Sequence, residues 1–305
     1  MRKVIYHHGK ILLSGEYLIL DGAWGLALPT QKGQQLDYHI LENEQGKLFW
    51  KSYDESNALW VEAVFEIPNI RPIFSTNPVA INFLEKLLKS TQALSSYFLR
   101  DKQGIGITTH LEFSPFWGLG SSATLICNLS KIAHISPYEL LWNVAKGSGY
   151  DIACVLEEKP ILYKVENQTP HIIPSFFSPP FKDKLFFLYL EKKKNTKEAI
   201  SFYEKKKIYL KEQIIQEISI ISKALLSVKS LDDFERLLEL HEEILSKTLK
   251  MPTLKQKLFS QYKGLIKSLG GWGGDFALIS YREGMKSYFL EKGYSILIPF
   301  KEMIL

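Results

Sequence analysis

The feature that most limits the fold of this chain is a change of pattern near its middle. The first half consists of short runs of β-branched and aromatic residues separated by turn residues, which is typical of strands. After the proline-rich stretch Pro170–Pro180, long segments with apolar residues at helical spacing take over. Strands and helices do not alternate regularly and the sequence has no internal repeat, which predicts an α+β fold. We place the domain boundary in the proline-rich stretch and expect domains of residues 1–170 and 171–305.

Turn and capping residues divide each half into expected elements. An Asn-Pro pair opens one helix, and Ser-Pro-Tyr-Glu from Ser136 supplies a cap, a first-turn proline and the capping-box residue Glu139 for another. In the first half we expect helices at Asn77–Leu88, Ser121–His134 and from Ser136 onward, and strands at Val4–Tyr6, Ile11–Ser14, Trp24–Ala27, Leu36–Ile40, Lys47–Trp50, Leu59–Phe65 and Ile105–Phe113. In the second half we expect strands at Leu185–Leu190, Phe276–Ser280 and Tyr294–Pro299, and helices at about Thr196–Val228, Ser230–Leu249, Pro252–Ser268 and Met285–Lys292.

Length and composition narrow the class of protein. With 305 residues and 46% hydrophobic composition, the chain can bury a core in each domain. The early apolar run Ile11–Leu28 is interrupted by Glu16 and Asp21, so it fits neither a membrane span nor a signal peptide. We therefore expect a soluble, cytoplasmic protein without a membrane partner. The cysteines Cys127 and Cys154 lack the spacing of a zinc site or redox motif, and we interpret them as small core residues.

The formal charge of +5 is concentrated in local lysine runs. Lys192–Lys194 and Lys205–Lys207 are typical of a solvated helix surface, so we expect no nucleic-acid partner. A mildly basic protein does favour anionic, phosphate-bearing ligands.

A glycine-serine loop, Gly118-Leu119-Gly120-Ser121-Ser122-Ala123, leads into the helix expected at Ser121. Its glycines permit backbone angles that other residues avoid, and they let a ligand approach the main chain closely. The free N–H groups of the first helical turn and the helix dipole then favour an anion. Taken alone, the loop is equally typical of a structural glycine turn. It is not a P-loop, and its formal match to the dinucleotide fingerprint lies outside a βαβ unit.

Three further segments combine glycines with a side chain that suits phosphate chemistry. Lys10 starts a short strand and can hold an anion, although surface lysines are common there, and Glu16 nearby is a lesser candidate for a substrate contact. Asp151 follows the glycine-rich turn Gly147–Gly149 and can accept a proton from an attacking hydroxyl, or cap a helix. Gly270–Asp275 holds four glycines in five residues, which indicates close packing of the backbone against a loop or ligand.

Together and in this order, these segments resemble the GHMP kinases, the superfamily of galactokinase, homoserine kinase, mevalonate kinase and phosphomevalonate kinase. Gly9–Tyr17 is similar to the first motif of that superfamily, Gly118–Ala123 matches its GLGSSA phosphate loop, and Gly270–Asp275 is similar to its third motif. Gly147–Ala153 and the Gly-Gly-Asp ending are most similar to phosphomevalonate kinases. The resemblance implies an N-terminal α+β domain, a ferredoxin-like C-terminal α/β sandwich, and ATP bound in the cleft between them.

The resemblance also implies roles for single residues. ATP phosphates are expected on Gly118–Ala123, with Ser122 as a magnesium ligand, Asp151 as the catalytic aspartate and Lys10 as its cationic neighbour. The second magnesium ligand stays open, because Glu139, the one carboxylate on the helix before Asp151, is accounted for by its capping box. Trp272 replaces the usual alanine between glycines and is expected to narrow or reshape the acceptor pocket. The implied substrate contacts are Glu16, Tyr17, Gly149, Tyr150, Thr196, Gly271, Gly273 and Gly274.

The implied activity is phosphoryl transfer from Mg·ATP to a small molecule such as mevalonate, phosphomevalonate or a related small acid, by a monomer or homodimer. Asp151 favours a hydroxyl acceptor, whereas the basic segment Lys192–Lys197 favours a phosphorylated one, so the acceptor stays open. The alternative is a catalytically inactive relative that binds nucleotide or metabolite as a regulator. Ser122, Asp151 and Lys10 together favour the enzyme, and a Rossmann-type oxidoreductase is a distant third interpretation.

Overall fold

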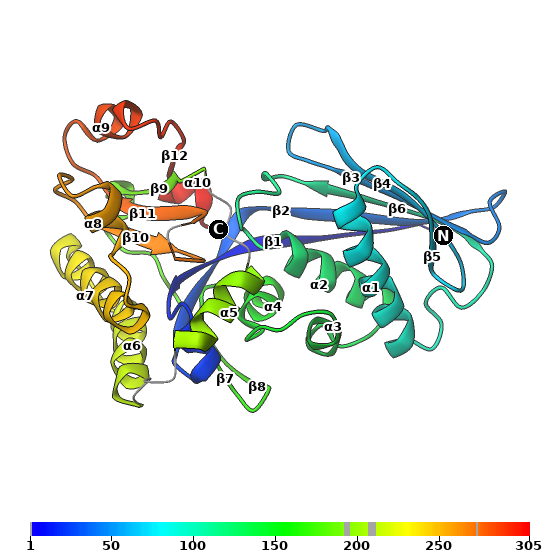
Figure 1. Ribbon diagram of the computed structural model, residues 1–305, viewed down its shortest axis with the longest axis horizontal. Coiled ribbons are helices and arrows are strands. Elements are labelled where there is room, and N and C mark those ends of the chain that lie inside the picture. The colour runs from blue at the N-terminus through cyan, green and yellow to red at the C-terminus, as the bar shows by residue number, and fades with distance from the viewer. Residues whose placement is uncertain (1, 192–195, 207–211, 273) are drawn as a thin grey trace. The chain divides into compact units, whose positions relative to one another are not determined.

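The computed structural model describes residues 2–191, 196–206, 212–272 and 274–305 (Figure 1). Contacts group the chain into two units, each assembled from segments that are far apart in the sequence. The long strands β1 (Arg2–Ser14) and β2 (Gly25–Leu41) contribute residues to both units. The expected α+β fold is confirmed. Unit 1 comprises Met1–Gly9, Lys32–Pro115 and Leu119–Lys146, and unit 2 comprises Lys10–Gln31, Phe116–Gly118 and Gly147–Leu305.

Unit 1 contains a sheet whose strands follow the order β5-β4-β3-β6-β2. Strands β3 and β6 are parallel and the other neighbours are antiparallel. Alternate residues of β4, namely Val61, Ala63 and Phe65, are buried, so one face of the strand forms core. The bounds are β3 (Lys47–Tyr53), β4 (Leu59–Glu66), β5 (Arg71–Ser75) and β6 (Gly104–Leu111).

Three helices of unit 1, α1 (Pro78–Leu94), α2 (Ser121–Ala133) and α3 (Pro137–Val144), contact one another and lie on the same side of these strands (Figure 1). Their start sites follow the expected capping chemistry. Asn77 Oδ1 accepts hydrogen bonds from Val79 N at 3.1 Å and Ala80 N at 3.0 Å. Ser136 Oγ accepts a hydrogen bond from Glu139 N at 3.4 Å, so the expected helix start at Ser136 is confirmed.

Unit 2 contains two groups of strands. The first residues of β2 pair with β7 (Ile161–Glu166), which pairs with β8 (Thr169–Pro174). A separate four-stranded antiparallel sheet has the order β10-β11-β9-β12. Its strands are β9 (Leu185–Tyr189), β10 (Ile266–Leu269), β11 (Phe276–Ser280) and β12 (Leu297–Pro299).

Helices of unit 2 pack on both groups of strands. Helix α4 contacts β7 and β8, α7 contacts α6 and β10, and α8 contacts β10 (Figure 1). The short helix η1 (Leu18–Asp21) contacts β7 and α6. The helix bounds are α4 (Tyr150–Glu157), α5 (Thr196–Lys206), α6 (Glu212–Ala224), α7 (Leu231–Leu249), α8 (Leu254–Leu258), α9 (Met285–Glu291) and α10 (Phe300–Met303), and the second short helix is η2 (Lys182–Lys184).

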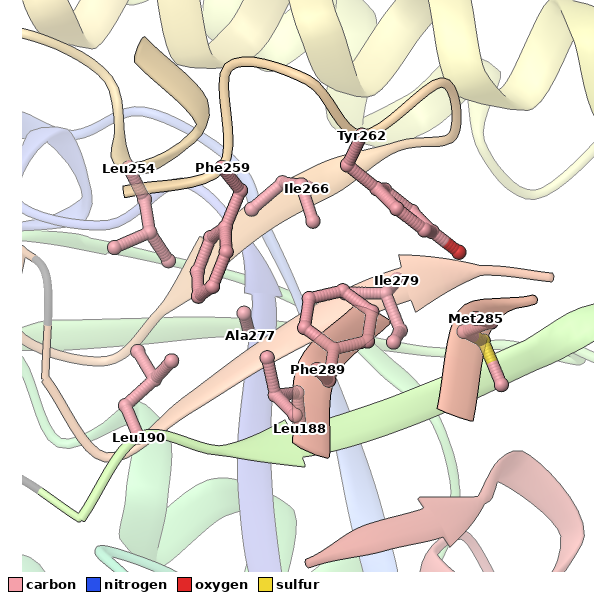
Figure 2. Packing of buried hydrophobic residues seen from close by; sticks show 10 residues of the cluster. All are labelled: Leu188, Leu190, Leu254, Phe259, Tyr262, Ile266, Ala277, Ile279, Met285 and Phe289. Atoms are coloured by element: carbon pink, nitrogen blue, oxygen red, sulfur yellow. The ribbon is translucent and has the colours of Figure 1, made fainter. Parts of the chain in front are cut away.

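An apolar core packs against β9, β10 and β11 in unit 2 (Figure 2). Phe259 and Phe289 meet there edge to face, with ring centroids 5.3 Å apart. Ile266 of β10 belongs to this core, so the alternation of side chains along a strand directs the next residue, Lys267, to the opposite face. The cluster consists of Leu188, Leu190, Leu254, Phe259, Tyr262, Ile266, Ala277, Ile279, Met285 and Phe289.

One expectation for the second half is wrong. The helix expected over Pro252–Ser268 is only the short α8, because the residues from Ile266 onward pair with β11 as strand β10. The proline-rich stretch Pro170–Pro180 begins within strand β8, which is the last strand in the order of its sheet. Proline is tolerated in an edge strand because one side of that strand needs no N–H donor. The helix expected over Thr196–Val228 is described as α5 and α6, with residues 207–211 outside the described ranges.

Two composition-based expectations can be compared with the fold. Cys127 and Cys154 are both buried, as expected of small core residues. In the part of the chain that the structure describes, every helix is too short or too polar to cross a membrane.

Candidate active site

The glycine-serine loop forms an uncapped helix start in unit 1. Helix α2 begins at Ser121, and its N-cap Gly120 has a φ of 92° and supplies no capping side chain. The first intrahelical hydrogen bond runs from Thr124 N to Gly120 O at 3.0 Å, so the N–H groups of the three preceding residues lie ahead of the helical ladder. Ser122 is exposed, Ser121 is half-buried, and Ala123 is buried. This end of a thirteen-residue helix therefore has the chemistry of an anion site.

Side chains of unit 1 fix the start of α2. The Thr124 hydroxyl donates to Gln34 Oε1 of β2 at 2.6 Å. One turn further along, Asn128 Oδ1 lies 2.8 Å from His7 Nδ1 of β1, and both residues are buried. Buried polar pairs of this kind hold the helix in one position on the strands. The contact gives His7 a structural role in unit 1.

In unit 2, Lys10 is held by Tyr150 and by Gly118, the first residue of the glycine-serine loop. Its ammonium donates to Tyr150 Oη at 2.9 Å and to the carbonyl of Gly118 at 3.3 Å. Burial alone would lower the pKa of Lys10, but Tyr150, Asp151 and Asp275 outweigh it and raise that pKa to about 12. Lys10 is therefore a cation at neutral pH, anchored to a carbonyl two residues before the N-cap of α2.

Asp151 lies in the first turn of α4, directly after the glycine-rich turn. Gly149 is the N-cap with a φ of 84°, and Asp151 Oδ1 accepts a hydrogen bond from Ile152 N at 3.1 Å. The buried Tyr163 hydroxyl donates to Ser148 O at 2.5 Å and so fixes the turn. A carboxylate in the first turn is favoured by the helix dipole. The turn thus delivers one half-buried carboxylate to the neighbourhood of Lys10.

Asp275 is a second carboxylate near Lys10, and the sequence analysis did not single it out. A Cβ built on Gly118 would lie only 2.2 Å from Asp275 Oδ2, so this carboxylate lies directly against the Gly118 backbone. Asp275 itself has a φ of 52°, in the left-handed region that few residues other than glycine adopt. The available signal was its position at the end of the Gly-Gly-Asp motif. Lys10 therefore faces two carboxylates and one phenol.

The glycines before Asp275 form a tight turn tied to the first motif. Gly274 N donates to Gly271 O at 2.9 Å, and the backbone N–H of Trp272 donates to the Tyr17 hydroxyl at 2.7 Å. The Trp272 indole is buried and donates to Pro252 O at 3.1 Å. In unit 2, the bulk of Trp272 therefore packs the glycine turn against the segment before α8.

The remaining predicted site residues differ in their surroundings. Glu16 is buried, and its Oε1 accepts a hydrogen bond from Lys267 Nζ at 2.7 Å. Thr196 is the first residue of α5, where only its backbone is described, and Gly273 lies outside the described residues. The structure thus brings Lys10, Tyr150 and Gly118 together, and it commits the Glu16 carboxylate to an internal ion pair.

The donor groups suit a magnesium ion that arrives with a nucleotide. Among the described residues, no three His, Cys, Asp or Glu side chains are grouped to hold a metal ion by themselves. Magnesium is typically bound by one or two carboxylates together with phosphates and water. In unit 2, Asp151 and Asp275 carry carboxylate oxygens, which have the hardness that magnesium requires of a ligand. The donor chemistry therefore fits Mg·ATP better than a resident ion.

No protein-family model and no curated protein sequence matches the chain, but solved structures do. Mevalonate kinase of Methanococcus jannaschii aligns with a TM-score of 0.66 and 19% identity, over 96% of this chain and 94% of that chain. Phosphomevalonate kinase of Streptococcus pneumoniae aligns with a TM-score of 0.64 and 15% identity, over 97% and 98%. Galactokinase of Lactococcus lactis, solved with galactose, aligns with a TM-score of 0.65 and 13% identity, over 95% and 88%.

These three enzymes are GHMP kinases, and likeness at such low identity is evidence of fold rather than of activity. The match covers nearly the whole chain in each case. It agrees with the large sheet and the second, smaller sheet described above. The chain therefore has the two-domain GHMP kinase fold.

Proposed function

We propose that this chain is a Mg·ATP-dependent kinase that phosphorylates a small-molecule hydroxyl. The observation that carries the proposal is the position of Lys10, whose ammonium is bonded to Tyr150 and to the Gly118 carbonyl. Phosphoryl transfer depends on alignment of the reactants and on compensation of charge, which a fixed cation supplies.

The proposed roles follow from charge and geometry. The free N–H groups at the start of α2 bind phosphate oxygens, and the exposed Ser122 hydroxyl serves as a ligand of the nucleotide-bound ion. Magnesium, when bound with ATP, supplies charge shielding among the phosphates. Lys10 contributes a further positive charge beside the loop, and Asp151 accepts the proton of the attacking hydroxyl.

The acceptor follows from the charges around Lys10. Asp151 and Asp275 both act on the Lys10 ammonium, so the described residues bring two negative charges near this one positive charge. Such surroundings favour a neutral hydroxyl over a phosphate as the attacking group, because a dianionic phosphate would meet two carboxylates. Mevalonate is the first acceptor to test, since the compared structures include a mevalonate kinase of Leishmania major complexed with R-mevalonate. We propose Tyr17, Gly149, Tyr150, Gly271 and Gly274, with Thr196 and Gly273, as the acceptor-binding set.

The test is an ADP-release assay on the purified chain with Mg·ATP and mevalonate, phosphomevalonate, galactose or homoserine. We expect mevalonate to stimulate turnover most. Asp151→Asn should lower kcat by about 100-fold or more, because general-base catalysis contributes at least that factor. Asp183→Asn is the matched control, since the Asp183 side chain is 74% exposed and lies in the short helix η2.

Two outcomes would change the assignment. If ATP binds but no acceptor stimulates turnover, the chain is a nucleotide-binding regulator on a kinase fold. If an acceptor is phosphorylated and Asp151→Asn retains the full rate, the kinase assignment stands and the proton acceptor is another group.

A further inference from the structure

A buried cluster of four titratable side chains in unit 2 takes no part in the proposed chemistry. Glu16 follows β1, His241 and Glu242 lie on α7, and Lys267 lies on β10. Their exposed fractions are 4%, 0%, 3% and 0%, respectively. Lys267 Nζ lies 2.7 Å from Glu16 Oε1 and 3.2 Å from Glu242 Oε1, and it also donates to Ser268 O at 2.6 Å. One ammonium therefore serves two carboxyl groups away from water.

The backbone determines the protonation of His241. The N–H of Gly15 donates to His241 Nε2 at 2.9 Å. A backbone amide keeps its proton, so Nε2 must present a lone pair, and a neutral imidazole then carries its hydrogen on Nδ1. Burial and the Lys267 charge agree with this, because both hold the pKa of His241 well below its usual 6.5.

The neighbour of that nitrogen is a carboxyl oxygen. Glu16 Oε2 lies 3.3 Å from His241 Nε2, whose lone pair is already used by Gly15. Two acceptor atoms at this distance repel each other, and a proton on Glu16 lowers that repulsion because it removes the charge of the carboxylate. Within the described residues, Glu16 Oε2 is buried without a hydrogen-bond partner.

The charge count leads to the same result. With both carboxyls ionised and His241 neutral, the cluster would hold a net negative charge, and an unpaired buried ion costs several kcal/mol. A single proton removes that charge. Burial, opposed by Lys267, raises the pKa of Glu16 to about 7, and the Glu242 charge adds to the rise. The pKa of Glu242 is also raised by burial, and Tyr17 is a further titratable neighbour of Glu16.

We propose that Glu16 and Glu242 share one proton at neutral pH, and that this protonated cluster, with His241 as neutral acceptor, positions the turn of residues 15–17. The turn needs such support. A Cβ on Gly15 would lie 2.6 Å from Gly25 Cα, and Tyr17 has a φ of 64° and a ψ of −53°. Through its hydroxyl, Tyr17 then fixes the backbone of Trp272 in the glycine turn. Glu16, His241 and Lys267 are thus positioning residues.

The consequence is a dependence of the turn on pH. Loss of the shared proton leaves a carboxylate that faces the His241 lone pair. This carboxylate repels the imidazole or changes its polarisation, so the hydrogen bond that Gly15 donates to His241 Nε2 weakens. The chemical shift of the Gly15 amide therefore follows the titration of the carboxyl groups. Glu16→Gln imitates the protonated acid, so this variant keeps the turn ordered across the neutral range.

The test is an NMR titration of the full chain, labelled with carboxyl ¹³C in glutamate and with ¹⁵N in glycine. We expect one glutamate signal, coupled to a second, to titrate near neutrality, and the Gly15 amide to shift with the same midpoint. Both neutral-range transitions should disappear in Glu16→Gln and move in Glu242→Gln. Glu302→Gln, at an exposed position, is the matched control and should leave both unchanged.

The proposal is overturned if every glutamate titrates in the ordinary acidic range, or if the Gly15 amide does not follow the carboxyl. A kinetic measurement adds a functional check, which rests on the proposed function. As pH increases, the KM for the acceptor should rise with the same midpoint in the wild type and stay constant in Glu16→Gln. Because the NMR readouts need no turnover, failure of the kinase assignment and failure of the cluster are distinguishable.

Discussion

At the scale of single residues, Gly118 is the position where the phosphate loop most clearly requires glycine. Its φ of 68° lies in the left-handed region, and an added Cβ would lie 2.2 Å from Asp275 Oδ2. The carbonyl of the same residue accepts the Lys10 hydrogen bond. Two site side chains therefore depend on the path of one backbone unit.

Gly118→Ala should lower both stability and nucleotide affinity. Gly284→Ala is the matched control, because Gly284 also has a positive φ, 76°, but has no atom within 4 Å of the added Cβ. Each substitution costs roughly 1 kcal/mol of backbone strain. Only Gly118→Ala also displaces Asp275, so we expect a larger loss in urea denaturation and about tenfold weaker ATP binding. Equal losses of stability and unchanged ATP affinity would show that the carboxylate moves away freely.

Residue patterns identified part of the site. Lys10 and Asp151 could be predicted because glycines beside them indicate close approach of a ligand. The hydrogen bond from Lys10 to Tyr150 could not be predicted, because it joins positions 140 residues apart. Glu16 was expected at the substrate, whereas its carboxylate is paired with Lys267, 251 positions away. Lysines are mostly exposed, so the local sequence favours a surface position for Lys267, which is fully buried in the structure.

At the scale of elements, periodicity and caps worked where they agreed with tertiary packing. The expected helix Ser230–Leu249 corresponds to α7, whose N-cap Ser230 accepts a hydrogen bond from Asp233 N. The helix expected over Pro252–Ser268 was wrong because pairing with β11 overrides local propensity from Ile266 onward. Short apolar segments such as this one satisfy both helical and strand patterns, and only the partner strand decides between them.

Glu16, which follows β1, and His241 of α7 create opposing pH dependences of stability. The folded pKa of Glu16, about 7, lies above its ordinary 4.5, so the folded state binds more protons between these values and stability falls as pH rises. The folded pKa of His241 lies well below 6.5, so below that pH the unfolded state binds more protons and stability falls as pH falls. Between 4.5 and 6.5 the two effects offset each other.

Single substitutions should separate the two effects. Relative to the wild type, His241→Gln should gain stability as pH falls below 6.5, by at most roughly 1.4 kcal/mol per pH unit, while its amide oxygen still accepts from Gly15. Glu16→Gln should instead gain relative stability as pH rises from 4.5 to 7. Urea denaturation at a series of pH values measures both differences. If both variants gain stability relative to the wild type in the same direction of pH, or if neither difference changes with pH, the assignment of the protons is contradicted.

At the scale of the whole molecule, the units are not continuous stretches of sequence. Residues 10–31 belong with 147–305 in unit 2. There they form hydrogen bonds and a β-bridge that no sequence pattern indicates. Ser14 Oγ donates to Ser222 Oγ at 2.8 Å, and Trp24 N donates to Ser219 Oγ at 3.0 Å. Thr30 forms a β-bridge with Ile304. A proline-rich break indicates where a chain changes direction, but it cannot show which earlier segment completes the later one.

These contacts predict that residues 171–305, the expected C-terminal domain, do not fold alone. The fragment keeps His241, Glu242 and Lys267 but lacks Gly15 and Glu16, so the buried ammonium loses its 2.7 Å partner. Removing one partner of a buried ion pair costs about 3–5 kcal/mol, which is comparable with the total stability of many domains. We expect a poorly dispersed NMR spectrum and a broad, non-cooperative thermal transition for the fragment, and more order when a peptide of residues 10–31 is added. A cooperative transition of the fragment alone would instead support a domain boundary at residue 170.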